Sequence, residues 1–209
     1  ASKIDWVDGV ELHCVHDYSF DHQELTRLKS FDCNSIHLHW YSQHDRERLI
    51  YSSQTIPNFS HAVLHPDIAK LDDIDDAVES LLSFENMDIR KSSYQQPNEM
   101  VNLFQRFPDA SFTLDINHAE ENNIPIKAFD SIKKPKQIHF SVVNQDYYND
   151  YPEIQTPHAL AILSNNFQFD FTPYTDAIVT CEWVYPPWKI DLIQQEVDLI
   201  LSLLNEQKQ

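Results

Sequence analysis

The sequence predicts an α/β protein, a compact (β/α) barrel of the TIM type that forms one domain over residues 1–209. Three observations support this fold class. Short β-like runs recur along the chain, amphipathic helical patterns lie between them, and each run stops on an ionisable residue. Alternating strands and helices predict a parallel sheet with right-handed crossovers.

Seven runs carry the strand pattern, and their last residues follow one another at intervals of 20 to 43 positions. Most of these intervals approach the ~30 residues of one βα unit. The expected strands are 9–13, 35–39, 61–65, 81–85, 111–115, 137–139 (running on to 143) and 177–182. A closed barrel of this class has eight strands, so one strand is missing from the count.

Helical patterns fill the intervals between the strands. Apolar residues at i, i+3, i+4 and i+7 predict a helix around 100–107 and a long final helix around 193–204. The interval before Glu85 leaves room for only a brief helix, about 74–80. The interval after His139 carries a long insertion, about 144–175, and we expect this insertion to form a lid over the site.

Composition argues against several functional classes. A net charge of −18 makes nucleic acid an unlikely partner, because nucleic-acid affinity comes largely from Lys and Arg. With a single glycine, the chain has no Gly-rich phosphate loop of the Rossmann or P-loop kind. Three cysteines at unrelated spacings indicate free buried thiols in a reducing cytoplasm, and neither a signal peptide nor a membrane span is predicted.

The ionisable strand ends predict a metal site. In a parallel barrel the carboxyl ends of the strands share one face, where barrel enzymes place their chemistry. Burying a carboxylate or an imidazole there costs several kcal/mol unless the group is paired or bound to metal. A single strand-end His or Glu is more often a hydrogen-bonded loop residue than a ligand, but seven together favour a divalent cation. Oxygen and imidazole ligands suit Mn²⁺, Zn²⁺, Co²⁺, Fe²⁺ or Mg²⁺.

Five short motifs at these strand ends resemble those of the xylose-isomerase-like superfamily. They are His65-Pro66-Asp67, Glu85-Asn86-Met87-Asp88, Leu114-Asp115-Ile116-Asn117-His118, Ile138-His139-Phe140-Ser141 and Cys181-Glu182. The superfamily holds sugar isomerases and epimerases beside AP endonucleases of the endonuclease IV type. Order and spacing agree from about residue 9 to residue 200.

The resemblance implies a ligand set. The principal metal ligands would be Glu85, Asp115, His139 and Glu182. A second metal, or an outer shell around the first, would involve His39, His65, His118 and His158, with His37 on the same strand face as His39.

The sequence also departs from the family pattern. Thr156 stands where the nuclease branch has an Asp, and Asp67 replaces a Gly near the mouth of the site. Residues 9–13 match the family's second strand, so the first strand is missing. The barrel is then either incomplete or closed by a partner chain, which would make the protein a homo-oligomer.

As an isomerase or epimerase, the protein would act on a small sugar-like substrate. The metal would act as a Lewis acid on a chelated hydroxy-carbonyl group, with Glu85 and Glu182 as catalytic acid and base. Aromatic side chains near the mouth would stack on the sugar: Trp40, Tyr41, Trp183 and Tyr185.

Two alternatives stay open. The first is a metal-dependent phosphoesterase or AP endonuclease, which shares the ligands but needs a basic track for DNA. The second is a shortened barrel that keeps the motifs without catalysis.

Overall fold

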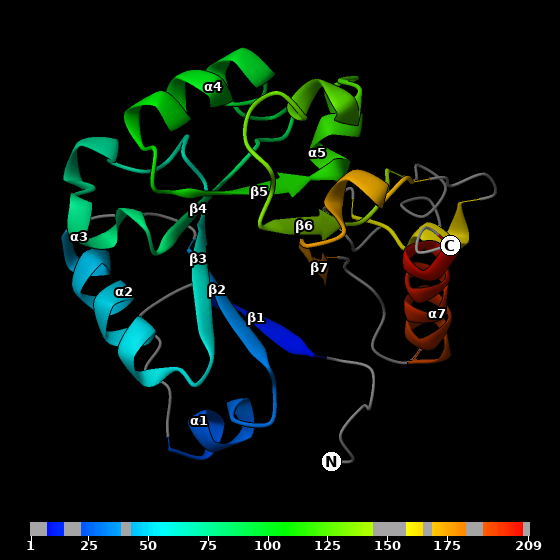
Figure 1. The fold of residues 1–209 in the computed structure, drawn as a ribbon, viewed down its shortest axis with the longest axis horizontal. Helices are drawn as coiled ribbons and strands as arrows, with labels where there is room; N and C mark the ends of the chain where they lie inside the picture. Colours follow the sequence, from blue (N-terminus) through cyan, green and yellow to red (C-terminus); the bar gives the residue numbers. More distant parts are fainter. Residues whose placement is uncertain are drawn as a thin grey trace.

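The computed structural model of the chain describes residues 8–14, 22–38, 43–143, 158–164, 169–182 and 190–206. Within them, seven parallel strands pair in chain order and form a nearly closed α/β barrel (Figure 1). The strands are β1 (Gly9–Cys14), β2 (Cys33–Leu38), β3 (Phe59–Leu64), β4 (Leu82–Glu85), β5 (Ser111–Asp115), β6 (Gln137–Phe140) and β7 (Ile178–Cys181). Among the described residues, no strand pairing joins β7 back to β1.

Helices lie between the strands and cover the outer side of the sheet (Figure 1). The α-helices are α1 (His22–Leu28), α2 (Gln43–Thr55), α3 (Asp76–Glu79), α4 (Pro97–Arg106), α5 (Ile116–Glu121) and α7 (Ile190–Glu206). The 3₁₀ helices are η1 (Leu71–Asp73), η2 (Ile126–Phe129), η3 (Ala161–Leu163) and η4 (Thr172–Tyr174). No helix in the described part of the chain has both the length and the apolar character that a membrane span requires.

The seven expected strands and the two expected helices are confirmed, the helices as α4 and α7. The brief helix before Glu85 is also confirmed, as α3. The expected lid falls largely on residues 144–157 and 165–168, which lie outside the described residues. The described part of this insertion contains η3 and η4 and begins with an antiparallel bridge between Val142 and Ala159.

Local sequence explains where these elements lie. Pro97 occupies the first turn of α4, and the Glu99 carboxylate accepts the Gln96 N–H at 2.9 Å, which satisfies a donor that the helix leaves open. At the start of β1, a Cβ on Gly9 would lie 2.2 Å from the carbonyl oxygen of Cys33. The single glycine of the chain therefore lets β1 approach β2.

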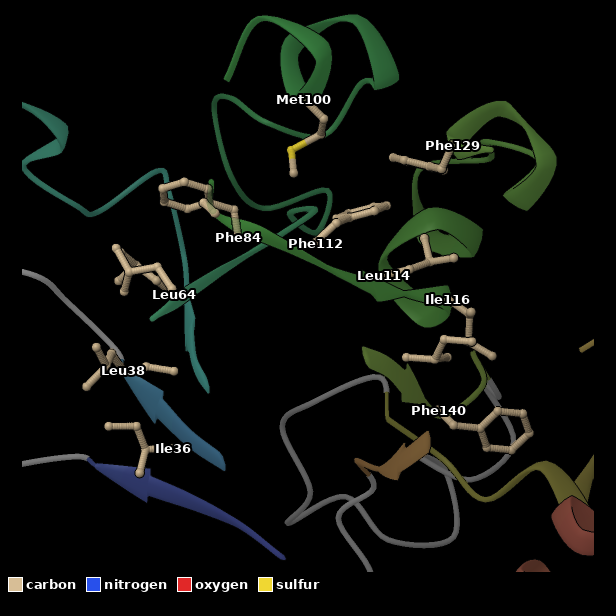
Figure 2. Packing of buried hydrophobic residues seen from close by; sticks show 14 of the residues in the cluster. Ile36, Leu38, Leu64, Phe84, Met100, Phe112, Leu114, Ile116, Phe129 and Phe140 are labelled. Carbon is tan, nitrogen blue, oxygen red and sulfur yellow. The ribbon is translucent and has the colours of Figure 1, made fainter. Parts of the chain in front are cut away.

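The hydrophobic core lies between the sheet and the helices. Alternate strand residues point outward into it, including Ile36, Leu64, Phe84, Phe112 and Phe140 (Figure 2). Met100 of α4 and Phe129 of η2 pack into the same cluster from the helical layer (Figure 2). This packing removes large apolar side chains from water, each worth roughly 1.5–3 kcal/mol.

The inward-facing residues of the strands are mostly polar. The Ser83 and Thr113 hydroxyls hydrogen-bond each other at 2.6 Å between β4 and β5. Gln137 of β6 donates to Glu11 of β1 at 2.6 Å, across the inside of the barrel. A TIM barrel usually fills this space with branched apolar residues, so the polar interior sets this barrel apart.

The cysteines agree in part with the expectation of free buried thiols. Cys33 and Cys181 are free and half-buried, and burial raises the pKa of the Cys181 thiol to about 12, which keeps it protonated and inert. The side chain of Cys14 lies outside the described part of the structure.

Candidate metal centre

Four strand ends bring together the residues assigned as principal ligands. Glu85 ends β4, Asp115 ends β5, His139 lies in β6 and Glu182 follows β7. One ligand atom from each lies within 4.8 Å of the others, and we call these four residues the central set. Glu85, Asp115 and His139 are fully buried, whereas the Glu182 side chain is 19% exposed.

Distances within the central set fit a small cation. The Nδ1 atom of His139 lies 2.8 Å from Oε2 of Glu182 and 3.2 Å from Oε1 of Glu85. Neighbouring ligands of a tetrahedral ion with bonds near 2.0–2.1 Å lie about 3.3 Å apart. The central set is therefore close to the geometry that a metal would require.

A second group shares Glu85, and we call it the His65 set. His65 Nε2 and His37 Nε2 lie 3.0 and 3.4 Å from the same Glu85 oxygen, Oε2, and 2.9 Å from each other. Three ligand atoms thus form a compact triangle at the ends of β2, β3 and β4.

A third group shares Asp115 and consists of Asp115, His118 and His158, which we call the His158 set. His118 Nε2 lies 3.6 Å from Asp115 Oδ2, and the His118 and His158 rings have centroids 5.5 Å apart. The expected Asp position of the nuclease branch, Thr156, lies outside the described residues.

Local hydrogen bonds fix the shared carboxylate of Asp115. The Asn86 side chain bonds both the N–H and the carbonyl of Asp115, at 2.8 and 2.9 Å, and so ties the end of β4 to the end of β5. Asp115 also caps α5, because its Oδ1 accepts the His118 N–H at 2.8 Å. Its Oδ2, which has no hydrogen-bond partner, is the atom that faces His118 Nε2.

Two histidines are oriented through the ring nitrogen that faces away from their set. His118 Nδ1 donates to the carbonyl of Asn86 at 2.8 Å, and His158 Nδ1 contacts the Ser141 hydroxyl at 2.8 Å. Both contacts leave Nε2 directed at the His158 set. Metal-binding histidines are commonly held in this way.

The carboxylates of the cluster differ in charge state. Burial raises the pKa of Asp115 well above its usual value, and the nearby charges of Glu182 and Glu85 add to the effect. Burial also acts to raise the pKa of Glu85 and Glu182, but the surrounding imidazoles, His139 foremost, together outweigh it. The pKa of Glu182 falls to about 2 and that of Glu85 lies well below its usual value.

The histidines divide into two kinds. Burial tends to lower their pKa values, but Glu11 and Glu85 raise the pKa of His37 to about 10, and Glu182, Glu11 and Glu85 raise that of His139. For His158 burial dominates and lowers the pKa to about 4, so this imidazole is neutral and able to act as a ligand.

Sequence reasoning missed Glu11 and gave His37 too small a role. His37 belongs to three of the possible ligand groups, including one with Glu11 and His13. Glu11 lies two residues before the end of the expected strand, so a search restricted to strand ends passes over it. The available signal was the two-residue alternation that places Glu11 on the same face as His13.

The remaining expected site residues lie outside the described part of the chain. These are His39, Trp40, Tyr41, Trp183 and Tyr185. Asp67, the expected negative charge near the mouth, pairs with Lys91 at 3.2 Å, and Arg90 is held by both oxygens of Asp88.

No protein-family model, curated protein or solved structure matches the chain. The resemblance to the xylose-isomerase-like superfamily therefore stands on the five sequence motifs alone.

Proposed function

We propose that this TIM-type barrel is a divalent-metal-dependent enzyme whose cluster holds more than one cation. The observation that carries the proposal is the sharing of carboxylates: Glu85 belongs to the central set and the His65 set, and Asp115 to the central set and the His158 set. Bridging carboxylates of this kind are the usual means of holding two metal ions side by side.

The two oxygens of Glu85 divide between the groups. Oε1 lies 3.2 Å from His139 Nδ1 of the central set, whereas Oε2 faces His65 and His37 of the His65 set. Each oxygen therefore serves a different ligand group. A carboxylate engaged on both sides and fully buried is better suited to bridging ions than to exchanging protons with a substrate.

Clustered cations favour hydrolysis of a phosphoester as the reaction. One ion would supply a hydroxide by lowering the pKa of its water, and a second would stabilise the leaving oxygen. The residues of this chain would hold the ions and exclude bulk water. With a net charge of −18, a small phosphoester is a better substrate than DNA.

Proton transfer on a metal-chelated hydroxy-carbonyl, as in a sugar isomerase or epimerase, is the second candidate. The exposure of Glu182 favours it, because this carboxylate lies in the central set and is accessible to a substrate. That reaction needs one ion, in the central set, with Glu182 as acid or base.

Metal stoichiometry separates these candidates. Purified protein is saturated with Zn²⁺ or Mn²⁺, dialysed and analysed for metal, alone and as Asp115→Asn and Glu182→Gln variants. The matched control is Glu79→Gln, a buried carboxylate that bonds the Asp109 N–H away from the site. Two or three ions per chain support the hydrolase and one supports the isomerase, whereas no bound metal in the wild type contradicts both and favours a non-catalytic barrel.

Activity assays then decide the reaction. We expect hydrolysis of bis(p-nitrophenyl) phosphate that depends on metal and is lost in Asp115→Asn. Interconversion of ketose and aldose, or of C3 epimers, without phosphoester hydrolysis would reverse the order of the two candidates. Cleavage of abasic duplex DNA at physiological salt would contradict the preference for a small substrate.

A further inference from the structure

Glu11 is a buried carboxylate inside the barrel that the proposed function leaves without a role. It lies in the middle of β1, and its side chain is 3% exposed. One oxygen, Oε2, accepts hydrogen bonds from Ser35 Oγ at 3.1 Å and Gln137 Nε2 at 2.6 Å. These bonds fix the carboxylate between β1, β2 and β6.

The other oxygen of Glu11 contacts two histidines at the same distance. Oε1 lies 3.3 Å from Nδ1 of His37 and 3.3 Å from Nε2 of His139, and this His139 nitrogen also has the Gln137 amide nitrogen 2.7 Å away. The opposite nitrogens face Glu85, with His37 Nε2 3.4 Å from Oε2 and His139 Nδ1 3.2 Å from Oε1. Each imidazole therefore lies between Glu11 on one side and the proposed metal cluster on the other.

Ligand chemistry explains how a carboxylate in this position orients metal-binding histidines. A histidine binds a cation through an unprotonated nitrogen, so its proton must reside on the other nitrogen. A carboxylate at that second nitrogen accepts the proton in a hydrogen bond, fixes the tautomer and the ring orientation, and makes the ligand more basic. One such carboxylate serving two histidines would align the ligands of two neighbouring ions.

We propose that Glu11 is a positioning residue that orients His37 and His139 together as metal ligands. This inference rests on the proposed metal centre. It assigns Glu11 to the second ring nitrogens of both histidines and not to the metal itself. The exposed side chain of His13, whose Nε2 lies 3.9 Å from Glu11 Oε1, would then not be part of the centre.

The test compares Glu11→Gln with wild type and with Glu79→Gln in a Zn²⁺ titration against a chromophoric chelator. We expect Glu11→Gln to bind the same number of ions with about 10- to 100-fold weaker affinity, which is the usual effect of removing an outer partner of a ligand. Glu79→Gln should bind as the wild type does. Far-UV circular dichroism and urea unfolding check that each variant folds.

A second readout reports the tautomers directly. In Zn²⁺-loaded protein with ¹⁵N-labelled histidine, the His37 Nδ1–H and His139 Nε2–H protons should appear as hydrogen-bonded, slowly exchanging signals. We expect Glu11→Gln to shift both signals upfield and to speed their exchange. If Glu11 only tied β1 to the barrel, the two ring protons of a folded variant would not change together.

The possible outcomes separate this inference from the proposed function. If the wild type binds no metal, the proposed function is contradicted. If wild type and Glu11→Gln bind Zn²⁺ with equal affinity, only the proposed role of Glu11 is contradicted. Loss of one whole ion in both Glu11→Gln and His13→Gln would make Glu11 a ligand and overturn the positioning role. If Glu11→Gln does not fold, Glu11→Asp decides, because its shorter side chain cannot reach both histidines and wild-type affinity would contradict the proposal.

Discussion

At the scale of single residues, His61 shows how burial controls charge in this barrel. It lies in β3, fully removed from solvent, with the Ser60 hydroxyl 2.9 Å from Nδ1. Burial and the Lys136 ammonium lower its pKa from 6.5 to about 4. The unfolded chain therefore binds a proton before the folded protein does as pH falls.

The first prediction is a pH-dependent loss of stability caused by His61. Above pH 6.5 His61 is neutral in both the folded and the unfolded protein and does not change the free energy of unfolding. Between pH 6.5 and 4 only the unfolded chain gains the proton, so the free energy of unfolding should fall by up to about 3 kcal/mol. Urea unfolding of wild type and His61→Gln across this range measures the difference. A difference between the two curves that does not change with pH would show that His61 does not titrate in this window.

The second prediction is that Asp115 lowers the stability of the metal-free protein and is required for its stabilisation by metal. Because burial raises its pKa, the ionised carboxylate is unfavourable at neutral pH unless a cation neutralises it. Asp115→Asn keeps an oxygen for the His118 N–H and should stabilise the metal-free protein by about 1 kcal/mol. The stabilisation that wild type gains from excess Zn²⁺ should largely disappear in the variant.

Thermal unfolding with EDTA and with Zn²⁺ measures both effects of this change. Glu79→Gln is again the control, since Glu79 does not contact the cluster. A metal-free Asp115→Asn protein that is less stable than wild type would mean that the cluster histidines already neutralise the carboxylate.

Residues at strand ends were predictable, whereas the partners of Glu11 were not, for a physical reason. Glu85 and Asp115 follow apolar runs, so their position at the shared face can be read from local sequence. The partners of Glu11 are set by the pairing of β1 with β2 and by a contact with Gln137 that spans 126 positions. No local pattern encodes such a contact.

At the scale of elements, Glu196 joins α7 to the segment that carries His158. Its oxygens accept the N–H groups of Ala161 and Ile162, both at 2.8 Å, and its side chain is fully buried. Glu196 therefore caps η3 from a helix more than thirty positions away. α4 and α7 were predictable from apolar periodicity, whereas η3 depends on this distant partner.

The third prediction concerns this cap. Glu196→Ala leaves the buried Ala161 N–H and the part-buried Ile162 N–H without acceptors, and we expect a loss of about 2–4 kcal/mol in the free energy of unfolding. Hydrogen exchange at Ala161 and Ile162 should become faster than elsewhere. Because the change reaches only the His158 segment, Zn²⁺ binding should weaken at one site and not at the others.

Urea unfolding and amide exchange test the cap. Glu196→Gln, which keeps one good acceptor, should lose roughly half as much stability. Uniformly faster exchange across the barrel would contradict a local role and indicate that α7 docking as a whole depends on Glu196.

At the scale of the whole molecule, the barrel separates two environments. The apolar core lies outside the sheet, between strands and helices (Figure 2). Polar residues such as Glu11, Thr113 and Gln137 lie inside the barrel. The number and order of strands could be predicted from their spacing. Closure could not, because it depends on the edges β1 and β7, and closure by a second copy of the chain stays a prediction.

The large negative charge carries the last prediction. Thirty-three acidic residues against fifteen basic ones repel one another in the folded protein, and the repulsion is screened over about 10 Å at 0.1 M salt but about 30 Å at 0.01 M. The melting temperature of EDTA-treated protein should therefore rise by a few degrees between 10 and 300 mM salt, equally in NaCl and KCl. A divalent cation in the cluster acts differently, since it saturates at a few equivalents per chain and its effect is lost in Asp115→Asn. Stabilisation by Zn²⁺ that never saturates and survives this substitution would mean that the cation acts only on the general surface charge.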